Sequence, residues 1–276
     1  MNYRHIYHAG NFADVFKHIV LIALIQSFLK KETPFCYLET HAGIGCYDLY
    51  DAAAQKSKEF ETGVKKIFEK ENTLPLIQEY LTCIKKLNKT GELRYYPGSP
   101  YFAKQFLRTN DRMVLSELHP EDANTLKKFF KNDRNISIHH ENGYQSLKAF
   151  LPPKERRGLI LIDPPYEKPD ELLDIPNILA EALNRFETGV YAVWYPIKNH
   201  FALNRFYQAL KTKITRPQLR VEFFIHKEDS VISLKGCGMI ILNPPWQLAE
   251  SLKEILPVLC DTLAVDQGRF NLVLLW

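Results

Sequence analysis

The sequence predicts an α/β fold in which helices cover both faces of a mostly parallel sheet. Three observations support this prediction. Apolar runs of strand length alternate with segments of helical periodicity along most of the chain. One run, Gly158 to Ile162, is apolar throughout, as expected for a strand buried on both faces. Another, Phe35 to Thr40, leads into a turn containing Gly43 and Gly45, which lets the backbone approach a ligand closely.

Length and charge limit the class of protein. A chain of 276 residues fits a single domain, residues 1–276, with room for an insertion. The net charge of +4 is compatible with a nucleic-acid partner but does not by itself establish one. The apolar run Ile19 to Ile25 is too short for a membrane span and lacks the layout of a signal peptide. We therefore expect a cytoplasmic protein without a membrane partner.

Neither a disulfide framework nor a metal site is expected. The five cysteines are odd in number and scattered, without Cys-x-x-Cys spacing, which indicates reduced thiols. Three histidines of the N-terminal segment suggest a metal site, but their spacing matches no helical i,i+4 ligand pair. These histidines are His5, His8 and His18.

The first helix is expected to begin after a cap at Asn11 or Asp14 and to continue to about Leu29, with one apolar side. Lys17 and His18 fall in its first turns, where the helix dipole favours an anion such as a carboxylate. A purely structural role, as a polar cap with solvent-facing side chains, is the alternative.

Between about 47 and 94 the pattern changes to charged helices, expected at 52–58, 62–70 and 76–87. This stretch is too long for an ordinary crossover, so we interpret residues 47–94 as a small helical insertion. Its lysines alternate with acids. These lysines could form either a solvated face of the insertion or a surface that faces RNA, and the sequence leaves both interpretations open.

The middle of the chain contains candidate nucleoside ligands. Ser99 is expected to cap a helix that begins at Pro100. The strand Met113 to Leu118 carries Glu117 at its end, where an acid can bind the two ribose hydroxyls of a nucleoside. After a helix at 121–130 and a strand at 136–140, Asn142 and Gly143 lie where a loop can contact the edge of an adenine ring.

The alternation continues to the end of the chain, with helices at 144–150, 172–186, 201–211 and 248–263 and a strand at 189–196. Strands 221–225 and 238–242 are joined by a short loop and are expected to be antiparallel. The second of them ends in Asn243-Pro244-Pro245-Trp246, which it would deliver to the edge of the sheet away from the ligand crevice. Residues 270–275 are expected to close the fold.

The strand Gly158 to Ile162 ends in Asp163-Pro164-Pro165-Tyr166, the DPPY motif. The two prolines stop the strand and hold the backbone stiff at the carboxyl edge of the sheet. Hydrogen bonds from an adenine amine to the Asp163 carboxylate and the Pro164 carbonyl would make its nitrogen electron-rich, while Tyr166 stacks on the base. A strand-ending turn without a catalytic role is the alternative.

The most distinctive stretches run almost from end to end: Tyr3-Arg4-His5, His8-Ala9-Gly10-Asn11 with Ala13-Asp14, Thr40-His41-Ala42-Gly43, Arg94 to Pro100, Glu117-Leu118-His119-Pro120, Arg157 to Tyr166, and Asn243 to Trp246. In this order they resemble the class I S-adenosylmethionine-dependent methyltransferases, and among them the bacterial 23S ribosomal RNA adenine-N6 methyltransferases of the J type. The resemblance implies a Rossmann-like, seven-stranded type of sheet with an antiparallel strand near the end.

The resemblance also implies a set of site residues. Those expected to bind S-adenosyl-L-methionine are His18, His41, Ser99, Glu117, Asn142, Gly143 and Asp163, with Asn142 standing where the family has aspartate. Asp163, Pro164 and Tyr166 would act on the amine, and Tyr3 would approach the RNA from a mobile N-terminal segment. The implied partner of this expected monomer is 23S ribosomal RNA, before ribosome assembly is complete.

Two other functions are compatible with the same residues. A DNA adenine-N6 methyltransferase would use the same tetrapeptide, although no large domain for reading a duplex is evident. A non-catalytic RNA-binding assembly factor would keep the fold alone, which the intact motif at Asp163 argues against.

Overall fold

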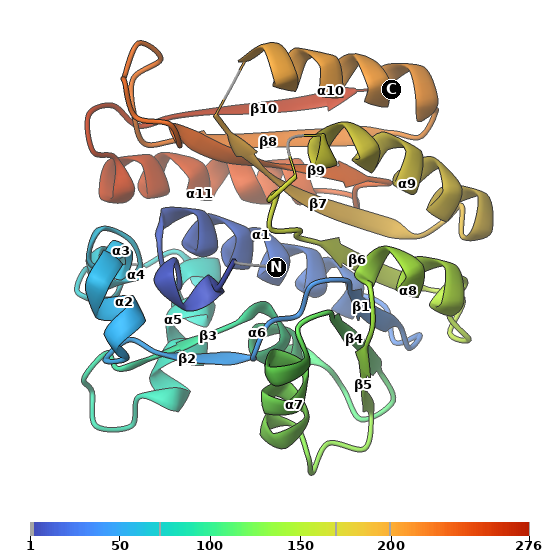
Figure 1. Ribbon diagram of the computed structural model, residues 1–276, viewed down its shortest axis with the longest axis horizontal. Helices are drawn as coiled ribbons and strands as arrows, with labels where there is room; N and C mark the ends of the chain where they lie inside the picture. The colour runs from blue at the N-terminus through green and yellow to red at the C-terminus, as the bar shows by residue number, and fades with distance from the viewer. Residues whose placement is uncertain (1–2, 72, 169, 199, 276) are drawn as a thin grey trace.

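The computed structural model describes residues 3–71, 73–168, 170–198 and 200–275, which form an eight-stranded sheet with helices on both faces (Figure 1). The order of the strands across the sheet is β10-β8-β9-β7-β6-β1-β4-β5. In chain order the strands are β1 (Cys36–Glu39), β4 (Arg112–Glu117), β5 (Ile136–His140), β6 (Gly158–Ile162), β7 (Val190–Ile197), β8 (Gln218–Phe224), β9 (Gly236–Leu242) and β10 (Arg269–Leu275). The predicted α/β class is confirmed.

The parallel middle of the sheet contains its topological switch point. Strand β1 pairs in parallel with β4 on one side and with β6 on the other, and the sheet extends from these to β5 and β7. Ligands of open α/β sheets bind at the carboxyl ends of the strands at such a point. The topology therefore brings the residues that follow β1 and β6, His41 and Asp163 among them, to one crevice.

The other side of the sheet is antiparallel. Strand β9 runs against both β7 and β8, and β10 runs against β8. The expected antiparallel strand near the end is confirmed, but the sheet has one strand more than the seven expected. Residues 270–275 form most of β10, because Phe270 and Leu272 pack on the apolar layer beneath the sheet while their backbone pairs with β8.

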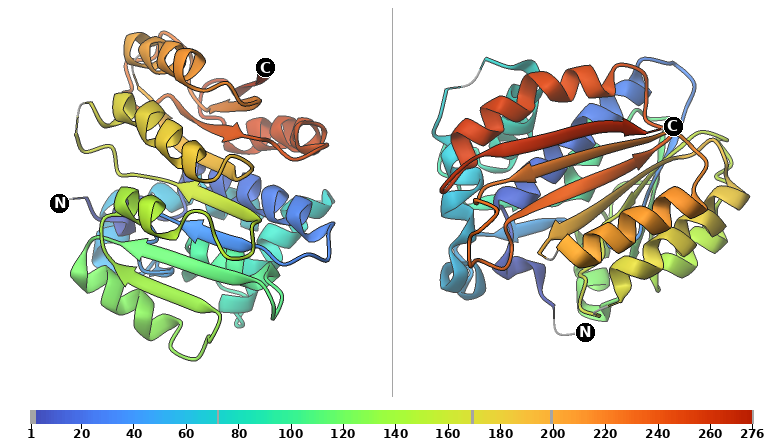
Figure 2. Two further views of the ribbon diagram at one scale, coloured as in Figure 1. Left: turned by 90° about the vertical axis from the view of Figure 1, so that its right-hand side faces the viewer. Right: turned by 90° about the horizontal axis from the view of Figure 1, so that it is seen from above.

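Two helical layers enclose the sheet (Figure 2). One contains α1 (Phe12–Leu29), α5 (Pro75–Leu87), α6 (Ser99–Phe106) and α11 (Leu248–Leu263), whose apolar side chains share one core cluster. The other contains α8 (Gly143–Phe150), α9 (Glu171–Arg185) and α10 (His200–Lys213), with a second core cluster. Helix α7 (Pro120–Phe129) packs on β4 and β5.

Helix α1 is the central helix of the first layer. Asn11 caps it by accepting a hydrogen bond from the Asp14 N–H, 2.9 Å away. The expected one-sided apolar pattern is wrong, because α5, α6 and α11 all pack on α1, in which even Lys17 and His18 are buried. Among the described helices, α1 alone is long and apolar enough to cross a membrane, and 83% of it is buried inside the protein, as in a core helix.

Residues 47–94 form a helical segment on a small base, in which β2 (Cys46–Asp48) pairs with β3 (Tyr95–Pro97). Its helices are α2 (Ala52–Ser57), α3 (Glu59–Thr62), α4 (Val64–Phe68) and α5. The helix predicted at 62–70 is present as the shorter α4, and a separate α3 that was not predicted precedes it, because the chain breaks at Gly63. A Cβ at that position would lie 2.1 Å from the Gly10 carbonyl oxygen, so the backbones of the helical segment and the N-terminal segment touch there.

Candidate active site

A pocket opens at the carboxyl ends of the parallel strands, and the N-terminal segment forms one of its walls. Most of the residues singled out from the sequence line it: Tyr3, His18, His41, Ser99, Glu117, Asp163, Pro164 and Tyr166. They come from six separate parts of the chain. The pocket therefore coincides with the crevice that the strand order defines.

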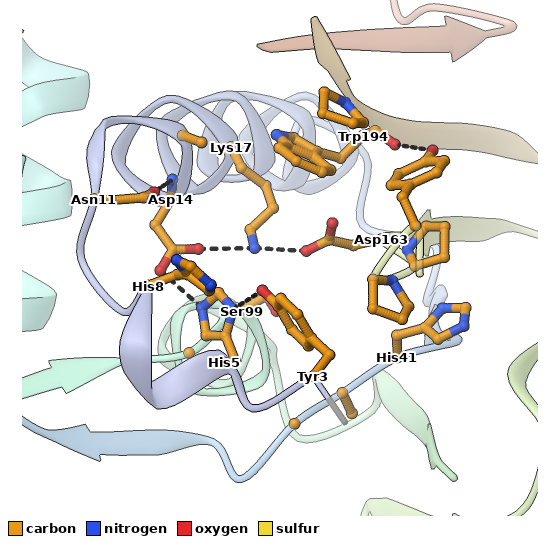
Figure 3. A pocket seen from close by; sticks show the side chains of 18 of the residues that line it. Tyr3, His5, His8, Asn11, Asp14, Lys17, His41, Ser99, Asp163 and Trp194 are labelled. Atoms are coloured by element: carbon orange, nitrogen blue, oxygen red, sulfur yellow. Dashed lines mark hydrogen bonds and ion pairs between the residues drawn. The ribbon is translucent and has the colours of Figure 1, made fainter. Parts of the chain in front are cut away.

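The Asp163 carboxylate does not stand alone in this pocket. Figure 3 shows the Lys17 ammonium between two carboxylates, 2.6 Å from Asp163 Oδ2 and 2.9 Å from Asp14 Oδ1. The side chain of Lys17 is 6% exposed and that of Asp163 is 16% exposed. Burial lowers the pKa of Lys17, but the two carboxylates outweigh it and hold the pKa well above its usual range. Lys17 is therefore a permanent cation.

A hydrogen-bonded chain extends from this cation to the N-terminal segment, whose 3-10 helix is η1 (His5–Tyr7). His5 Nε2 lies 2.9 Å from Asp14 Oδ2, and His5 Nδ1 lies 2.8 Å from the Tyr3 hydroxyl. Tyr3 is thereby linked through His5, Asp14 and Lys17 to Asp163 (Figure 3). An N-terminal residue and the carboxylate after β6 thus belong to one polar network.

The backbone at the end of the DPPY motif has an uncommon conformation. Tyr166 has a φ of 50°, a left-handed value that costs a non-glycine residue free energy and recurs at functional sites. Its hydroxyl donates a 2.5 Å hydrogen bond to the Trp194 carbonyl, and the two rings lie 5.9 Å apart. Tyr166 is thus fixed beside the pocket, with β7 supplying the anchor.

Glu117, expected to bind ribose, is already engaged by backbone donors. Gly43 N–H donates to Oε2 and His119 N–H donates to Oε1, each with a donor–acceptor distance of 2.8 Å. Burial raises the pKa of Glu117, and these two N–H groups oppose the rise. Each carboxylate oxygen has a second lone pair, so Glu117 can still accept bonds from a pair of hydroxyls.

His18 carries a polar atom without a partner. Its Nδ1 lies 2.7 Å from the Tyr96 hydroxyl, whereas its buried Nε2 has no hydrogen-bond partner among the described residues. Burial holds the pKa of His18 well below its usual range, so the ring is neutral. A buried orphan nitrogen in a pocket wall indicates a group supplied by a ligand. His41, with a pKa lowered to about 4 by burial, is neutral too.

The expectation that Ser99 caps the helix at Pro100 is wrong. Helix α6 begins at Ser99 itself with Gly98 as its cap residue, and the Ser99 hydroxyl donates instead to Glu39. Glu39 also accepts a 2.8 Å bond from the Tyr37 hydroxyl. Burial raises the pKa of this carboxyl to about 8, so Ser99 binds an acid that is largely protonated at neutral pH.

In the described chain, the walls of the pocket do not include Asn142 or Gly143. Asn142 caps α8 by accepting bonds from the N–H groups of Tyr144 and Gln145. Gly143 allows a close approach to the end of β1, since a Cβ there would lie 2.0 Å from the Thr40 carbonyl oxygen. The expected contact of this pair with an adenine stays a prediction, and Gly143 lies directly behind the loop that follows β1 and contains His41.

The second tetrapeptide lies at the opposite edge of the sheet, as the sequence predicts. Asn243 follows β9, which runs against β7, and its Nδ2 donates to the carbonyl oxygens of Glu187 and Gly189 just before β7 begins. Asn243 thus closes the amino edge of the sheet. Across the described residues, no group of three or more histidine, cysteine, aspartate or glutamate side chains is arranged to hold a metal ion.

Two features of the pocket were not predicted from the sequence. One is the chain of contacts from His5 through Asp14 and Lys17 to Asp163. The other is the presence of Trp194 and Lys198 in the pocket lining. A signal existed for the last two, since both lie at the carboxyl end of a predicted strand, where ligands bind. No signal in the sequence pointed to the contact between Lys17 and Asp163, because 146 residues separate them.

Comparisons with known proteins agree with this geometry. The family model described as "Ribosomal RNA large subunit methyltransferase D, RlmJ" matches residues 32–276. A Haemophilus influenzae protein named ribosomal RNA large subunit methyltransferase J is 41% identical over 277 residues, covering 100% of this chain and 98% of the relative. The Escherichia coli protein of the same name is 39% identical over 276 residues, with the same coverage of 100% and 98%.

Two solved structures have a similar fold. A crystal structure of a Legionella pneumophila protein, 38% identical, superposes with a TM-score of 0.89 over 96% of this chain and 98% of that one. A probable spermidine synthase from Corynebacterium glutamicum, 8% identical, has a TM-score of 0.51 over 95% of this chain and 75% of that one, which concerns the fold alone. This chain therefore belongs to the RlmJ family of large-subunit ribosomal RNA methyltransferases.

Proposed function

We propose that this protein transfers a methyl group from S-adenosyl-L-methionine to the exocyclic N6 amine of an adenine in 23S ribosomal RNA. The observation that carries the proposal is the Asp163 carboxylate, held by Lys17 at the switch point of the sheet and followed by a rigid Pro-Pro step. Family membership supports the reaction type and the RNA substrate. We further propose that residues 47–94 are an insertion into one methyltransferase domain that spans residues 1–276.

The pocket fits the methyl donor. Glu117 offers acceptors for a ribose diol, and the orphan His18 Nε2 can donate to a carboxylate when the Tyr96 hydroxyl donates to Nδ1. His41 and Ser99 line the same wall, and the proposal places them beside the donor. When bound, S-adenosyl-L-methionine supplies a methyl group on a sulfonium sulfur, an electrophile that needs no metal. The proposal also places Asn142 and Gly143, at the start of α8 behind this wall, near the adenine of the donor.

The chain's own residues would prepare the adenine amine. Lys17 holds Asp163 Oδ2, and in the described structure Oδ1 has no hydrogen-bond partner, so it can accept a bond from the N6 amine. The Pro164 carbonyl accepts the second N–H, and both bonds increase electron density on nitrogen. The nitrogen would gain the methyl carbon as the C–S bond to the sulfonium breaks and a neutral thioether leaves, and it would lose one proton, for which the Asp163 carboxylate is the near acceptor. Tyr166 stacks on the base and fixes the line of approach.

The proposed polymer is RNA from which the target base has been unstacked, because Asp163 lies inside a pocket that a paired base cannot enter. Tyr3 would contact this base from the N-terminal wall. We place the reaction in the cytoplasm, on RNA that is free of protein or at an early stage of assembly, with a monomeric enzyme. The lysines of the helical segment remain candidates for RNA contact.

The test is transfer of label from methyl-labelled S-adenosyl-L-methionine to protein-free large-subunit RNA from cells lacking the enzyme, followed by nucleoside analysis. Duplex DNA is the parallel substrate. Label recovered as N6-methyladenosine from RNA alone supports the proposal. Label in DNA would favour a DNA adenine methyltransferase, and intact donor binding without transfer to either polymer would favour an assembly factor.

A further inference from the structure

One part of the pocket rim has no role in the reaction proposed above. It consists of Lys198, which follows β7, and the loop between β8 and β9. Because β7 and β8 both run against β9, their carboxyl ends lie at the same edge of the sheet as Asp163. Lys198 and Leu234 line the pocket, and the loop projects beyond the sheet at the upper left of Figure 1.

The tip of this loop exposes apolar side chains. Val231 is 101% exposed and Ile232 is 45% exposed. A single exposed apolar residue is ordinary on a protein surface. Here two adjacent ones stand at the end of a loop whose Leu234, two residues after Ile232, lines the pocket.

The same rim carries cations. Lys198 is exposed, and no hydrogen bond or ion pair to it is found within the described residues. Lys227 is exposed as well, and the Lys235 ammonium is held by the Glu228 carbonyl.

The loop also contains two acids, Glu228 and Asp229. The Glu228 carboxylate lies 3.9 Å from the Arg269 guanidinium, which offsets its charge, and 3.7 Å from His200 Nε2. Lys198 lies at the pocket mouth and has no ion pair to either acid among the described residues, and such a cation can bind a phosphate.

We propose that this rim, made of Lys198, Lys227, Val231, Ile232, Leu234 and Lys235, holds the RNA stem from which the target adenine is extruded. Lys198 binds the phosphate of the extruded nucleotide, and Val231 and Ile232 enter the gap that the adenine leaves in the base stack. Apolar side chains inserted between bases offset the cost of unstacking in this way. The inference rests on the proposed function, because it requires a nucleic-acid substrate with a stacked target base.

The test compares two RNA substrates that carry the same adenine: a folded large-subunit transcript and a short single strand. The double variant Val231→Ser/Ile232→Ser should lower kcat/KM about tenfold on the folded transcript and less than about twofold on the single strand, where no stack has to be opened. The control is Trp246→Ala, which removes an 85% exposed side chain following β9 at the opposite edge. Its kcat/KM should equal that of the wild type on both substrates.

The phosphate contact has its own readout. Lys198→Gln should weaken binding of both RNAs and reduce the slope of log Kd against log salt by about one. Lys253→Gln, an exposed lysine on α11, is the matched control and should leave the slope unchanged.

Three results would overturn the inference: equal losses of the double variant on both RNAs, wild-type activity of that variant on both, or an unchanged salt slope in Lys198→Gln. Failure of the proposed function looks different, since the wild-type enzyme would then transfer no methyl group to either RNA.

Discussion

Lys17→Met tests how much the buried cation contributes. The substitution keeps an unbranched side chain of similar length but removes the charge between two carboxylates at 2.6 and 2.9 Å. Asp14 keeps His5 as a partner, whereas Asp163 loses its described ion pair. Breaking a buried pair in this way costs about 3–5 kcal/mol. At about 2 °C per kcal/mol for a domain of this size, Tm should fall by roughly 6–10 °C.

The loss of activity should exceed the loss of stability. Without Lys17 nothing in the described chain orients Asp163 Oδ2, so kcat should fall about 100-fold or more, as when a preorganised electrostatic group is removed from an active site. Labelled methyl transfer well below the Tm of the variant measures this loss, and calorimetry with the donor separates it from binding. Lys30→Met, an exposed lysine just after the same helix, is the control. Turnover of Lys17→Met within threefold of the wild type would refute the role given to this cation.

Three further predictions concern the support of the site. Glu39 has a pKa raised by burial to about 8 from an ordinary 4.5, so its contribution to stability is present below pH 4.5 and lost as the pH rises through about 8. Glu39→Gln should therefore raise the free energy of unfolding at pH 9 by up to about 5 kcal/mol and have little effect on it at pH 4.5. Denaturant titrations measure this quantity. An equal difference between variant and wild type at both pH values would contradict the prediction. Gly143→Ala should lower the free energy of unfolding by about 2–3 kcal/mol, because its Cβ would meet the Thr40 carbonyl oxygen at 2.0 Å, and should weaken donor binding in calorimetry; wild-type values for both would show that the His41 loop does not need this approach. His8 Nδ1 lies 2.9 Å from Glu59, which raises the pKa of His8 and ties the N-terminal segment to the helical segment. Glu59→Gln should therefore lower turnover at pH 6, with a deficit that narrows as the pH rises and His8 loses its charge, whereas a deficit independent of pH between 6 and 9 would exclude that ion pair as the cause.

Residues at the ends of predicted strands were placed correctly from the sequence. Asp163 and Glu117 line the pocket because the carboxyl ends of parallel strands meet at one edge, and strand runs are readable in a sequence. The position of Asn243 at the opposite edge followed from the short loop between β8 and β9, which forces antiparallel pairing.

Interactions between distant segments were not predictable in the same way. Ser99 precedes a proline and has the sequence pattern of a helix cap, but it is the first residue of α6 and donates to Glu39, which precedes it by 60 residues. Asn142 caps α8, a role that the local capping rule allows but that we did not predict for it. The ion pair between Lys17 and Asp163 depends on how α1 packs under the sheet, and no local pattern encodes that packing.

The most direct test of the account is single-turnover methyl transfer to large-subunit RNA by Asp163→Asn, with donor binding measured on the same preparation. Asparagine keeps the shape of the side chain but cannot act as a carboxylate toward the amine or pair with Lys17. We expect a rate at least about 1000-fold below that of the wild type, with a donor Kd within about fivefold of the wild-type value. Transfer at the wild-type rate would contradict the central role assigned to Asp163.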